Sequence, residues 1–285
     1  CMRVDNSEKL RNLIKNNSFI PIPSCFDALS AKLIEQTGFN VMFMSGFAAS
    51  ASRIGEPDLG VMTLTEVLDQ LNNITDATTL PVIGDGDTGY GNAMNVQRTV
   101  KSFAKIGCAG VLIEDQLSPK RCGHTPGKDV VSRQEAFDRI RASVDAREEK
   151  DILIMARTDA IATRGLDDAI KRMQSFSKLG VDILFIEAVK NKEDMKRIIQ
   201  EVPGHHMLNL IEDGETPLLQ IDEIEEIGYK IAVMPLTLMS ASVKTMQECL
   251  KNMRNKIYNK NVSKFSDLRE IVGFNEYYDI EDKYK

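Results

Sequence analysis

The chain has 285 residues, and its content of 42% hydrophobic and 27% charged residues is typical of a folded protein with a substantial core. Its net charge of −6 argues against a nucleic-acid partner, which normally requires a basic face. No apolar run approaches the roughly 20 residues that cross a membrane, and five scattered cysteines without a CxxC pair favour a reducing compartment.

We therefore expect a cytoplasmic protein without a signal peptide or membrane contact. Cys1 precedes Met2, which resembles a start methionine, so we expect Cys1 to be an addition and leave it out of the interpretation.

Apolar runs and helical patterns alternate along the chain. Leu10, Leu13 and Ile14 form one stripe, which predicts a first helix over residues 4–17. The later apolar runs are continuous, as in strands of a parallel sheet that is buried on both faces. We expect strands over residues 19–23, 41–44, 81–84, 110–113, 152–156, 183–186, 207–211 and 231–234. We expect further helices over residues 27–37, 65–74, 94–106, 133–147, 166–179, 192–202, 221–227 and 238–253, with an irregular stretch over 45–60.

Eight strand–helix units in one series predict an α/β protein that closes as a (β/α)₈ TIM barrel. No low-complexity linker divides the chain, so we expect a single domain over residues 1–285. Residues 255–285 would form an extra C-terminal tail, with a helical pattern over residues 263–280.

The stretch over residues 82–91 places two carboxylates, Asp85 and Asp87, directly after an apolar run. Residues two apart on an extended chain point to the same side, so both carboxylates can face one point. Such a pair suits a hard cation, Mg²⁺ or Mn²⁺, that keeps waters for a substrate to displace. A plain Asp/Gly turn is the structural alternative.

Other predicted strands also end in polar residues, and these ends share one face of a barrel, where active sites form. The polar residues at that face are Ser45, Asp85, Asp87, Glu114, Arg157, Glu187 and Asn209. The alternative for Arg157 and Glu187 is a salt bridge that only stabilises the barrel mouth.

The loop over residues 117–131 carries the sequence Lys120-Arg121-Cys122-Gly123-His124. Cations and a histidine beside a cysteine should lower its thiol pKa, and the loop could bring that group onto a substrate. The alternative is a solvated basic loop. Cys25, Cys108 and Cys249 are interpreted as packing residues. His205 and His206 precede a strand at the opposite face and are expected to be structural or exposed.

The cysteine-containing pentapeptide resembles the KKCGH/KRCGH signature of the isocitrate lyase and phosphoenolpyruvate mutase superfamily. Supporting motifs follow in the expected order: Ser45-Gly46, Pro57-Asp58, Asp85-Gly86-Asp87-Thr88-Gly89, Ile113-Glu114-Asp115-Gln116, Ala156-Arg157-Thr158-Asp159 and Glu187-Ala188. The resemblance implies a Mg²⁺-dependent barrel that cleaves a carbon–carbon bond of a small 2-hydroxy or 2-oxo dicarboxylate. It also implies a homotetramer whose subunits exchange the last helix.

Matched residue by residue, the resemblance assigns a role to each candidate. It makes Asp85 and Asp87 the metal positions, with Asp58 and Glu114 holding the metal's waters. The expected substrate contacts are Ser45, Gly46, Phe47 and Arg157 for the keto-acid half, Glu187 and Asn209 for the other carboxylate, and Gly123 and His124 on the covering loop. Cys122 would protonate the departing carbanion.

Departures from the family pattern narrow the expected substrate. Members that use phosphonates lack the Cys-Gly-His loop. Members that cleave 2-methylisocitrate carry arginines at two positions that are Ser240 and Phe274 in this chain. Residues 45–53 instead resemble the branch that contains 2,3-dimethylmalate lyase and petal death protein.

The alternatives are an oxaloacetate acetylhydrolase or decarboxylase and a 2-methylisocitrate lyase. A non-catalytic metabolite-binding barrel would lack the loop cysteine or the metal carboxylates, and this sequence has both.

Overall fold

The computed structural model describes residues 5–124, 126–147 and 151–285. Within these residues, eight parallel strands close into a barrel in sequence order, and β1 pairs with β8, for instance at Ile20 and Ile231. The strands are β1 (Ile20–Cys25), β2 (Met42–Met44), β3 (Val82–Asp85), β4 (Gly110–Glu114), β5 (Leu153–Thr158), β6 (Ile183–Ile186), β7 (His206–Asn209) and β8 (Ile231–Met234). The predicted (β/α)₈ architecture is confirmed.

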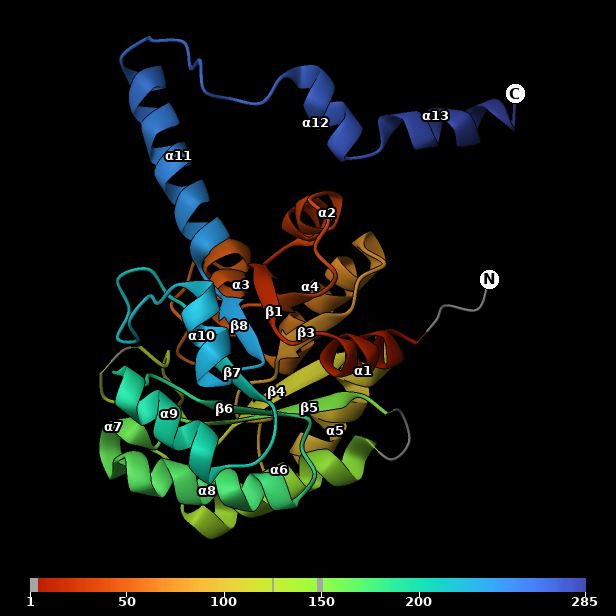
Figure 1. Cartoon of the computed structure of the whole chain (residues 1–285). Coiled ribbons are helices and arrows are strands. Elements are labelled where there is room, and N and C mark those ends of the chain that lie inside the picture. The colour runs from red at the N-terminus through yellow and green to blue at the C-terminus, as the bar shows by residue number, and fades with distance from the viewer. Residues whose placement is uncertain (1–4, 125, 148–150) are drawn as a thin grey trace.

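Helices surround the strands (Figure 1). They are α1 (Asn6–Asn16), α2 (Ala28–Gln36), α3 (Gly46–Arg53), α4 (Leu64–Ala77), α5 (Ala93–Lys105), α6 (Arg133–Ala146), α7 (Ile161–Arg164), α8 (Leu166–Lys178), α9 (Lys192–Glu201), α10 (Ile221–Ile227), α11 (Thr237–Arg254), α12 (Phe265–Ile271) and α13 (Phe274–Asp282). Side-chain caps fix several starts: Thr63 and Glu66 form a reciprocal capping box at α4, for example.

The apolar core has two layers, because successive strand residues point to opposite faces of the barrel wall. Leu112 belongs to a cluster inside the barrel, whereas Val111 and Ile113 belong to the cluster between strands and helices. Leu10 and Ile14 of α1 join the interior cluster. The first helix therefore closes the floor of the barrel, and the opposite end remains for a site.

The structure corrects several predicted boundaries. Residues 46–53 were predicted to be irregular but form α3, because the Ser45 hydroxyl caps the helix by accepting a hydrogen bond from the Ala48 amide at 3.2 Å. β5 continues through Arg157 and Thr158, two residues beyond its predicted end. His206 lies in β7 rather than before it.

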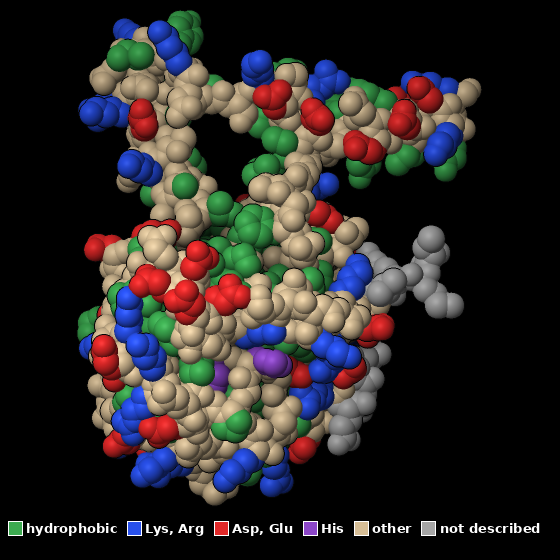
Figure 2. All heavy atoms as spheres, in the orientation of Figure 1, with side chains coloured by type: hydrophobic (Ala, Val, Ile, Leu, Met, Phe, Trp, Pro, Cys, Tyr) green, Lys and Arg blue, Asp and Glu red, His purple; other side chains and the backbone are tan. Residues whose placement is uncertain are grey.

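The predicted tail helices are present as α12 and α13, which follow the long α11. In Figure 1, α11 extends away from the barrel. α12 returns to α2, where Gln36 Nε2 donates to the Ile271 carbonyl at 3.1 Å. None of the residues of these three helices is buried. Figure 2 shows hydrophobic side chains between the barrel body and this tail. None of the described helices is both long and apolar enough to cross a membrane.

Candidate active site

One cavity opens at the carboxyl ends of the strands, on the side opposite α1. Phe43, Leu112, Phe185 and Met207 of the interior cluster line it. The cavity also brings together eleven of the predicted residues, which are Ser45, Gly46, Phe47, Asp58, Asp85, Cys122, Gly123, His124, Arg157, Glu187 and Asn209. The two remaining candidates, Asp87 and Glu114, contact the residues that line the cavity.

Asp85 and Asp87 lie at the end of β3, as predicted. The Asp87 amide donates to Asp85 Oδ1 at 3.0 Å, and Asp87 has a left-handed backbone with φ of 49°. Gly46 approaches this group so closely that a Cβ on it would lie 2.6 Å from Asp85 Oδ2. Only glycine therefore fits where α3 begins.

Lys120 bridges the carboxylates from the loop. Its Nζ forms an ion pair with Asp87 Oδ1 at 2.6 Å and another with Asp58. Burial raises the pKa of Asp87 to about 7, and the neighbouring Asp85 and Asp58 add to this rise, whereas Lys120 opposes it. The three carboxylates thus carry more negative charge than one lysine neutralises, and a further cation would be stabilised there.

The donor set suits magnesium. Among the described residues, no group of three His, Cys, Asp or Glu side chains is arranged to hold a metal ion by itself. Magnesium does not need one, because it is usually held by one or two carboxylates and keeps several waters. Glu114 Oε1 is buried and has no hydrogen-bond partner within the described part of the chain, so it can accept from such a water. Asp85 and Asp87 therefore fit the ion.

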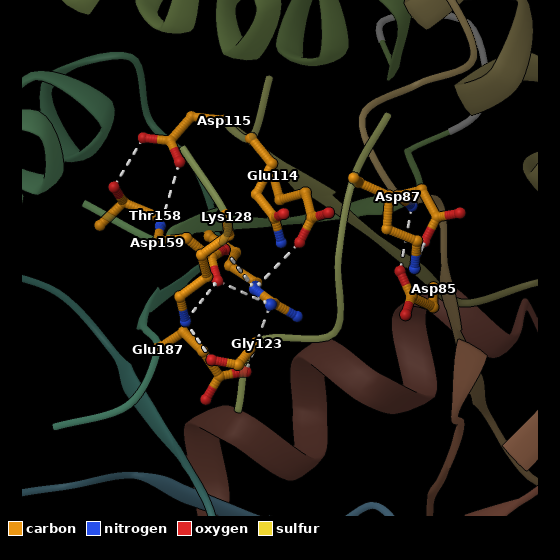
Figure 3. A network of polar contacts seen from close by, with 12 residues as sticks. Asp85, Asp87, Glu114, Asp115, Gly123, Lys128, Thr158, Asp159 and Glu187 are labelled. Atoms are coloured by element: carbon orange, nitrogen blue, oxygen red, sulfur yellow. Dashed lines mark hydrogen bonds and ion pairs between the residues drawn. The ribbon is translucent and has the colours of Figure 1, made fainter. Parts of the chain in front are cut away.

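Arg157 is the centre of a second charged group, whose carboxylates Glu114, Asp159 and Glu187 are labelled in Figure 3. Its Nε lies 2.8 Å from Asp159 Oδ2 and 3.0 Å from Glu114 Oε2. Its Nη2 donates to Asp159 Oδ1 at 2.9 Å and lies 3.4 Å from Glu187 Oε2. Burial alone would lower the pKa of Arg157, but these carboxylates raise it well above its ordinary value. The guanidinium is therefore charged, and it stacks 5.5 Å over the Phe185 ring.

Sequence reasoning did not select Asp159, although it holds Arg157 with two hydrogen bonds. The spacing of Arg157 and Asp159, two residues apart at a strand end, could have indicated that they share a side. Asp115, also missed, accepts from the Asp159 amide at 3.0 Å and from the Thr158 hydroxyl at 2.6 Å. Its Oδ2 lies 3.1 Å from Arg172 Nη1 of α8, so the support for Arg157 reaches the helical layer.

Glu187 connects the strand ends to the loop. It accepts from Asn209 Nδ2 at 3.1 Å and contacts His124 Nε2 at 3.0 Å. Burial would raise the pKa of Glu187, but Arg157 and His124 outweigh it and lower this pKa to about 2. The salt bridge that was the structural alternative for Arg157 and Glu187 is present, and it lies in the wall of the cavity.

The loop residues pack onto these charges. His124 Nδ1 accepts from the Glu215 amide at 3.1 Å, which assigns the ring proton to Nε2 and makes His124 the donor to Glu187. A Cβ on Gly123 would lie 2.5 Å from Arg157 Nη2 and from Glu187 Oε2. The signature glycine is thus required by close contact.

The predicted electrostatics of Cys122 are wrong. Burial raises the pKa of the Cys122 thiol, although the backbone at His124 and the charge of Arg157 act in the other direction. Lys120, which was expected to stabilise a thiolate, instead binds Asp58 and Asp87. Cys122 is therefore a protonated thiol at neutral pH, which is the form of a proton donor.

The other described cysteines and histidines do not line the cavity. Cys25 and Cys108 are buried in the outer core, as expected of packing residues. Cys249 is only partly buried on α11, so the structure does not support the predicted packing role for it. His206 is buried at the start of β7 and donates to the Val202 carbonyl at 2.8 Å, which agrees with a structural role.

The geometry defines a class: an α/β barrel whose cavity at the strand ends combines carboxylates, a buried arginine and a cysteine thiol. The family model for phosphoenolpyruvate phosphomutase matches residues 10–254. The chain belongs to the phosphoenolpyruvate mutase and isocitrate lyase superfamily.

Curated relatives are similar along almost their whole length. The chain is 38% identical to 2,3-dimethylmalate lyase of Eubacterium barkeri over 285 residues, covering 99% of both chains. It is 39% identical to 2-methylisocitrate lyase of Escherichia coli over 273 residues, covering 95% of this chain and 92% of the relative. The prediction of a carbon–carbon lyase is confirmed at the level of enzyme class.

Solved structures agree with this assignment. A crystal structure of 2,3-dimethylmalate lyase has a TM-score of 0.92 at 33% identity and covers 99% of this chain and 96% of that one. Oxaloacetate acetylhydrolase in complex with 3,3-difluorooxalacetate has a TM-score of 0.93 at 31% identity, with coverages of 98% and 97%. A phosphonopyruvate hydrolase complex with oxalate and Mg²⁺ has a TM-score of 0.87 at 25% identity, covering 99% of both chains.

Proposed function

We propose that this enzyme cleaves the C2–C3 bond of an alkyl-substituted 2-hydroxy dicarboxylate of the 2,3-dimethylmalate type. The products would be an α-keto acid such as pyruvate and a second carboxylate. The observation that carries the proposal is that the Cys122 thiol lies at the same cavity as Arg157 and Asp85. The similarity to 2,3-dimethylmalate lyase supports this substrate class.

The keto-acid half of the substrate would bind between α3 and Arg157. Gly46 and Phe47 lie in the first turn of α3, where backbone amides have no partner within the helix and favour anions. The Arg157 guanidinium provides a planar, charged donor for a carboxylate. Glu187 and Asn209 lie beside Arg157, since Glu187 Oε2 is 3.4 Å from Arg157 Nη2 and accepts from Asn209 Nδ2 at 3.1 Å, and they would orient the second half.

Mg²⁺ bound by Asp85 and Asp87, with waters held by Asp58 and Glu114, would act as a Lewis acid that polarises the C2 oxygen and stabilises enolate-like charge. The relative that contains Mg²⁺ supports this choice of ion, and Mn²⁺ would serve similarly.

The bond change needs one proton donor from the chain. When water accepts the proton of the C2 hydroxyl, the C2–C3 bond breaks and its electron pair remains on C3, beside the second carboxylate. The Cys122 thiol then gives its proton to C3, and the proton lost from the hydroxyl returns to the thiol through water. The reaction gains or loses no net proton. A thiol kept protonated by burial is suited to this role.

The cavity wall favours a dicarboxylate over a tricarboxylate. Ile211, Pro235 and Leu236 make one side of the cavity apolar. A buried third carboxylate would need a cation, because an unpaired buried charge costs several kcal/mol. Of the cations at the cavity, Lys120 is paired with Asp58 and Asp87, Arg157 is assigned to the keto-acid carboxylate, and Arg121 is exposed.

The positions that carry arginine in tricarboxylate-cleaving relatives offer no replacement. Ser240 and Phe274 are uncharged and are not among the residues that line the cavity. Lys244 and Arg254 are exposed on α11.

A substrate panel tests the proposal. We expect kcat/KM to be highest for 2,3-dimethylmalate when substrate consumption is measured for this acid, oxaloacetate and 2-methylisocitrate. A kcat/KM that is highest for 2-methylisocitrate would show that the third carboxylate finds a cation and that the proposed selectivity is wrong.

Oxaloacetate is the second candidate substrate, because the chain closely matches the structure of an oxaloacetate acetylhydrolase. Hydrolysis of oxaloacetate releases oxalate and acetate, whereas decarboxylation releases pyruvate and carbon dioxide. Product analysis by NMR on the same panel therefore separates these activities from dimethylmalate cleavage.

We also propose that the enzyme is a homotetramer whose subunits exchange their C-terminal helices. α11 and the tail expose large apolar side chains, which a soluble monomer rarely leaves uncovered in such number. Among them are Leu250, Met253, Phe265 and Tyr277, which are 63, 64, 75 and 72% exposed. Light scattering on the full chain should give four times the mass of one subunit, and the mass of a monomer would contradict exchange.

A further inference from the structure

Lys128 is a buried cation on the cysteine loop to which the proposed chemistry assigns no role. The residue is only 6% exposed. Its Nζ donates to the Gly123 carbonyl and lies 3.4 Å from Asp159 Oδ1. Figure 3 shows Lys128 close to Gly123 and Asp159. Because a buried charge is costly unless it is paired, both contacts are needed to keep the ammonium group in place.

The carboxylate that Lys128 contacts also holds Arg157. Asp159 Oδ1 accepts from Arg157 Nη2 at 2.9 Å, and Oδ2 accepts from Arg157 Nε at 2.8 Å. The backbone of Asp159 is fixed in turn, because its amide donates to Asp115. One immobile carboxylate therefore sets the position of both cations.

The other contact of Lys128 reaches the proposed proton donor. Gly123 directly follows Cys122, and it has no space to move inward, because even an added Cβ would lie 2.5 Å from Arg157 Nη2. Lys128 restrains the Gly123 carbonyl against outward movement. Together these contacts fix the position of the Cys122 backbone relative to Arg157.

We propose that Lys128 is a positioning residue. It connects the Gly123 carbonyl to the Asp159 carboxylate, which also binds Arg157. The position of the Cys122 thiol relative to the Arg157 guanidinium therefore depends on this one carboxylate. The inference rests on the proposed function only in taking Cys122 as the proton donor and Arg157 as the carboxylate-binding group.

The consequence for turnover is specific. Lys128→Met keeps the length of the side chain and removes the charged donor. The loop therefore keeps its packing but loses the contacts of Lys128 with the Gly123 carbonyl and Asp159. A displacement of about 1 Å at a reacting group can cost on the order of 10²-fold in rate. We therefore expect kcat to fall about that far, with a much smaller change in KM.

The alkylation rate of Cys122 reports how firmly the loop is held, and it does so independently of turnover. Iodoacetamide is added to the full-length protein, and modified peptides are quantified by mass spectrometry, with buried Cys108 as the internal reference. Loss of a nearby cation by itself disfavours the thiolate and slows alkylation. Faster alkylation of Cys122 in Lys128→Met therefore reports movement of the loop, and we expect an increase of at least about tenfold.

Two variants complete the design. Lys190→Met is the matched control, since the Lys190 side chain is 62% exposed and pairs with Glu215 at 3.7 Å on the same side of the barrel; its kcat and alkylation rate should equal those of the wild type. Lys128→Arg keeps the charge and should restore slow alkylation. Wild-type kcat and slow alkylation in a folded Lys128→Met protein would overturn the proposal.

If Lys128→Met does not fold, Asp159→Asn tests the same tie from the other side. It should speed alkylation of Cys122 and raise KM, and unchanged alkylation would again contradict the role of Lys128. A failure of the proposed function gives a different result. Cys122→Ser would then retain full kcat, while Lys128→Met would still change the alkylation rate of Cys122.

Discussion

Gly123→Ala tests whether the contact between the loop and the ion pair exists during turnover. A Cβ at this position would lie 2.5 Å from Arg157 Nη2 and Glu187 Oε2, whereas ordinary contact begins at 3.4 Å. Arg157 cannot yield, because Asp159 and Glu114 hold its Nε at 2.8 and 3.0 Å. The loop must instead move outward by about 0.9 Å, the difference between the two distances.

Such a movement carries Cys122 away from the substrate carbon. A misplacement of about 1 Å typically costs on the order of 10²-fold in rate, so kcat of Gly123→Ala should fall about that far. This corresponds to about 2.7 kcal/mol of transition-state stabilisation.

Steady-state kinetics on the best substrate of the panel, together with thermal unfolding, measure the effect. The control is Gly110→Ala at the start of β4, where the added Cβ meets Ile83 at 3.3 Å, far along the barrel from the site. It should lower stability slightly and leave kcat unchanged. A wild-type kcat in Gly123→Ala would mean that the loop does not lie against Arg157 and Glu187 when the bond breaks.

Three further expectations follow from the site. Cys122→Ser should lower kcat by about 10²–10⁴-fold and leave KM nearly unchanged, whereas Cys108→Ser should retain full turnover; equal kcat values in both variants would remove Cys122 from the chemistry. Burial raises the pKa of the Cys122 thiol above the ordinary cysteine pKa of about 8.5, so the thiol stays protonated up to that pH. We therefore expect kcat to stay level up to about pH 8.5 and to fall at higher pH, and an alkaline decline centred below about pH 8 would contradict this. A chelator should abolish activity, and Mg²⁺ or Mn²⁺ should restore it, so that full turnover in metal-free buffer would refute the assignment of Asp85 and Asp87.

The sequence was most informative where the fold depends on continuous apolar runs. All eight strands were located, because strands buried on both faces need such runs. Their polar ends meet for the same geometric reason, so residues as distant as Ser45 and Asn209 could be assigned to one cavity. α3 was missed, because its small residues and serine cap leave no apolar stripe.

Long-range charge pairing could not be predicted from the sequence. Lys120 stands two residues from Cys122 in the chain, yet its ammonium group binds Asp58 and Asp87, which come from other loops. Lys120 therefore does not stabilise a Cys122 thiolate, and burial raises the pKa of the thiol. The last two residues of β5 and the Lys128 contacts were missed for a related reason, because the partners of buried charges are known only once the chain is folded.

β4 ends in two neighbouring acids that serve opposite sides of the barrel wall. Glu114 reaches inward to Arg157, and Asp115 reaches outward to Thr158 and Arg172 (Figure 3). Because side chains alternate along a strand, inserting or deleting a single residue in β4 would exchange these two acids. Asp115 would then point into the cavity, and Glu114 would point toward the helices. Length changes in this protein are therefore tolerated far better in the loops than in this strand, whose residue count is part of the catalytic design.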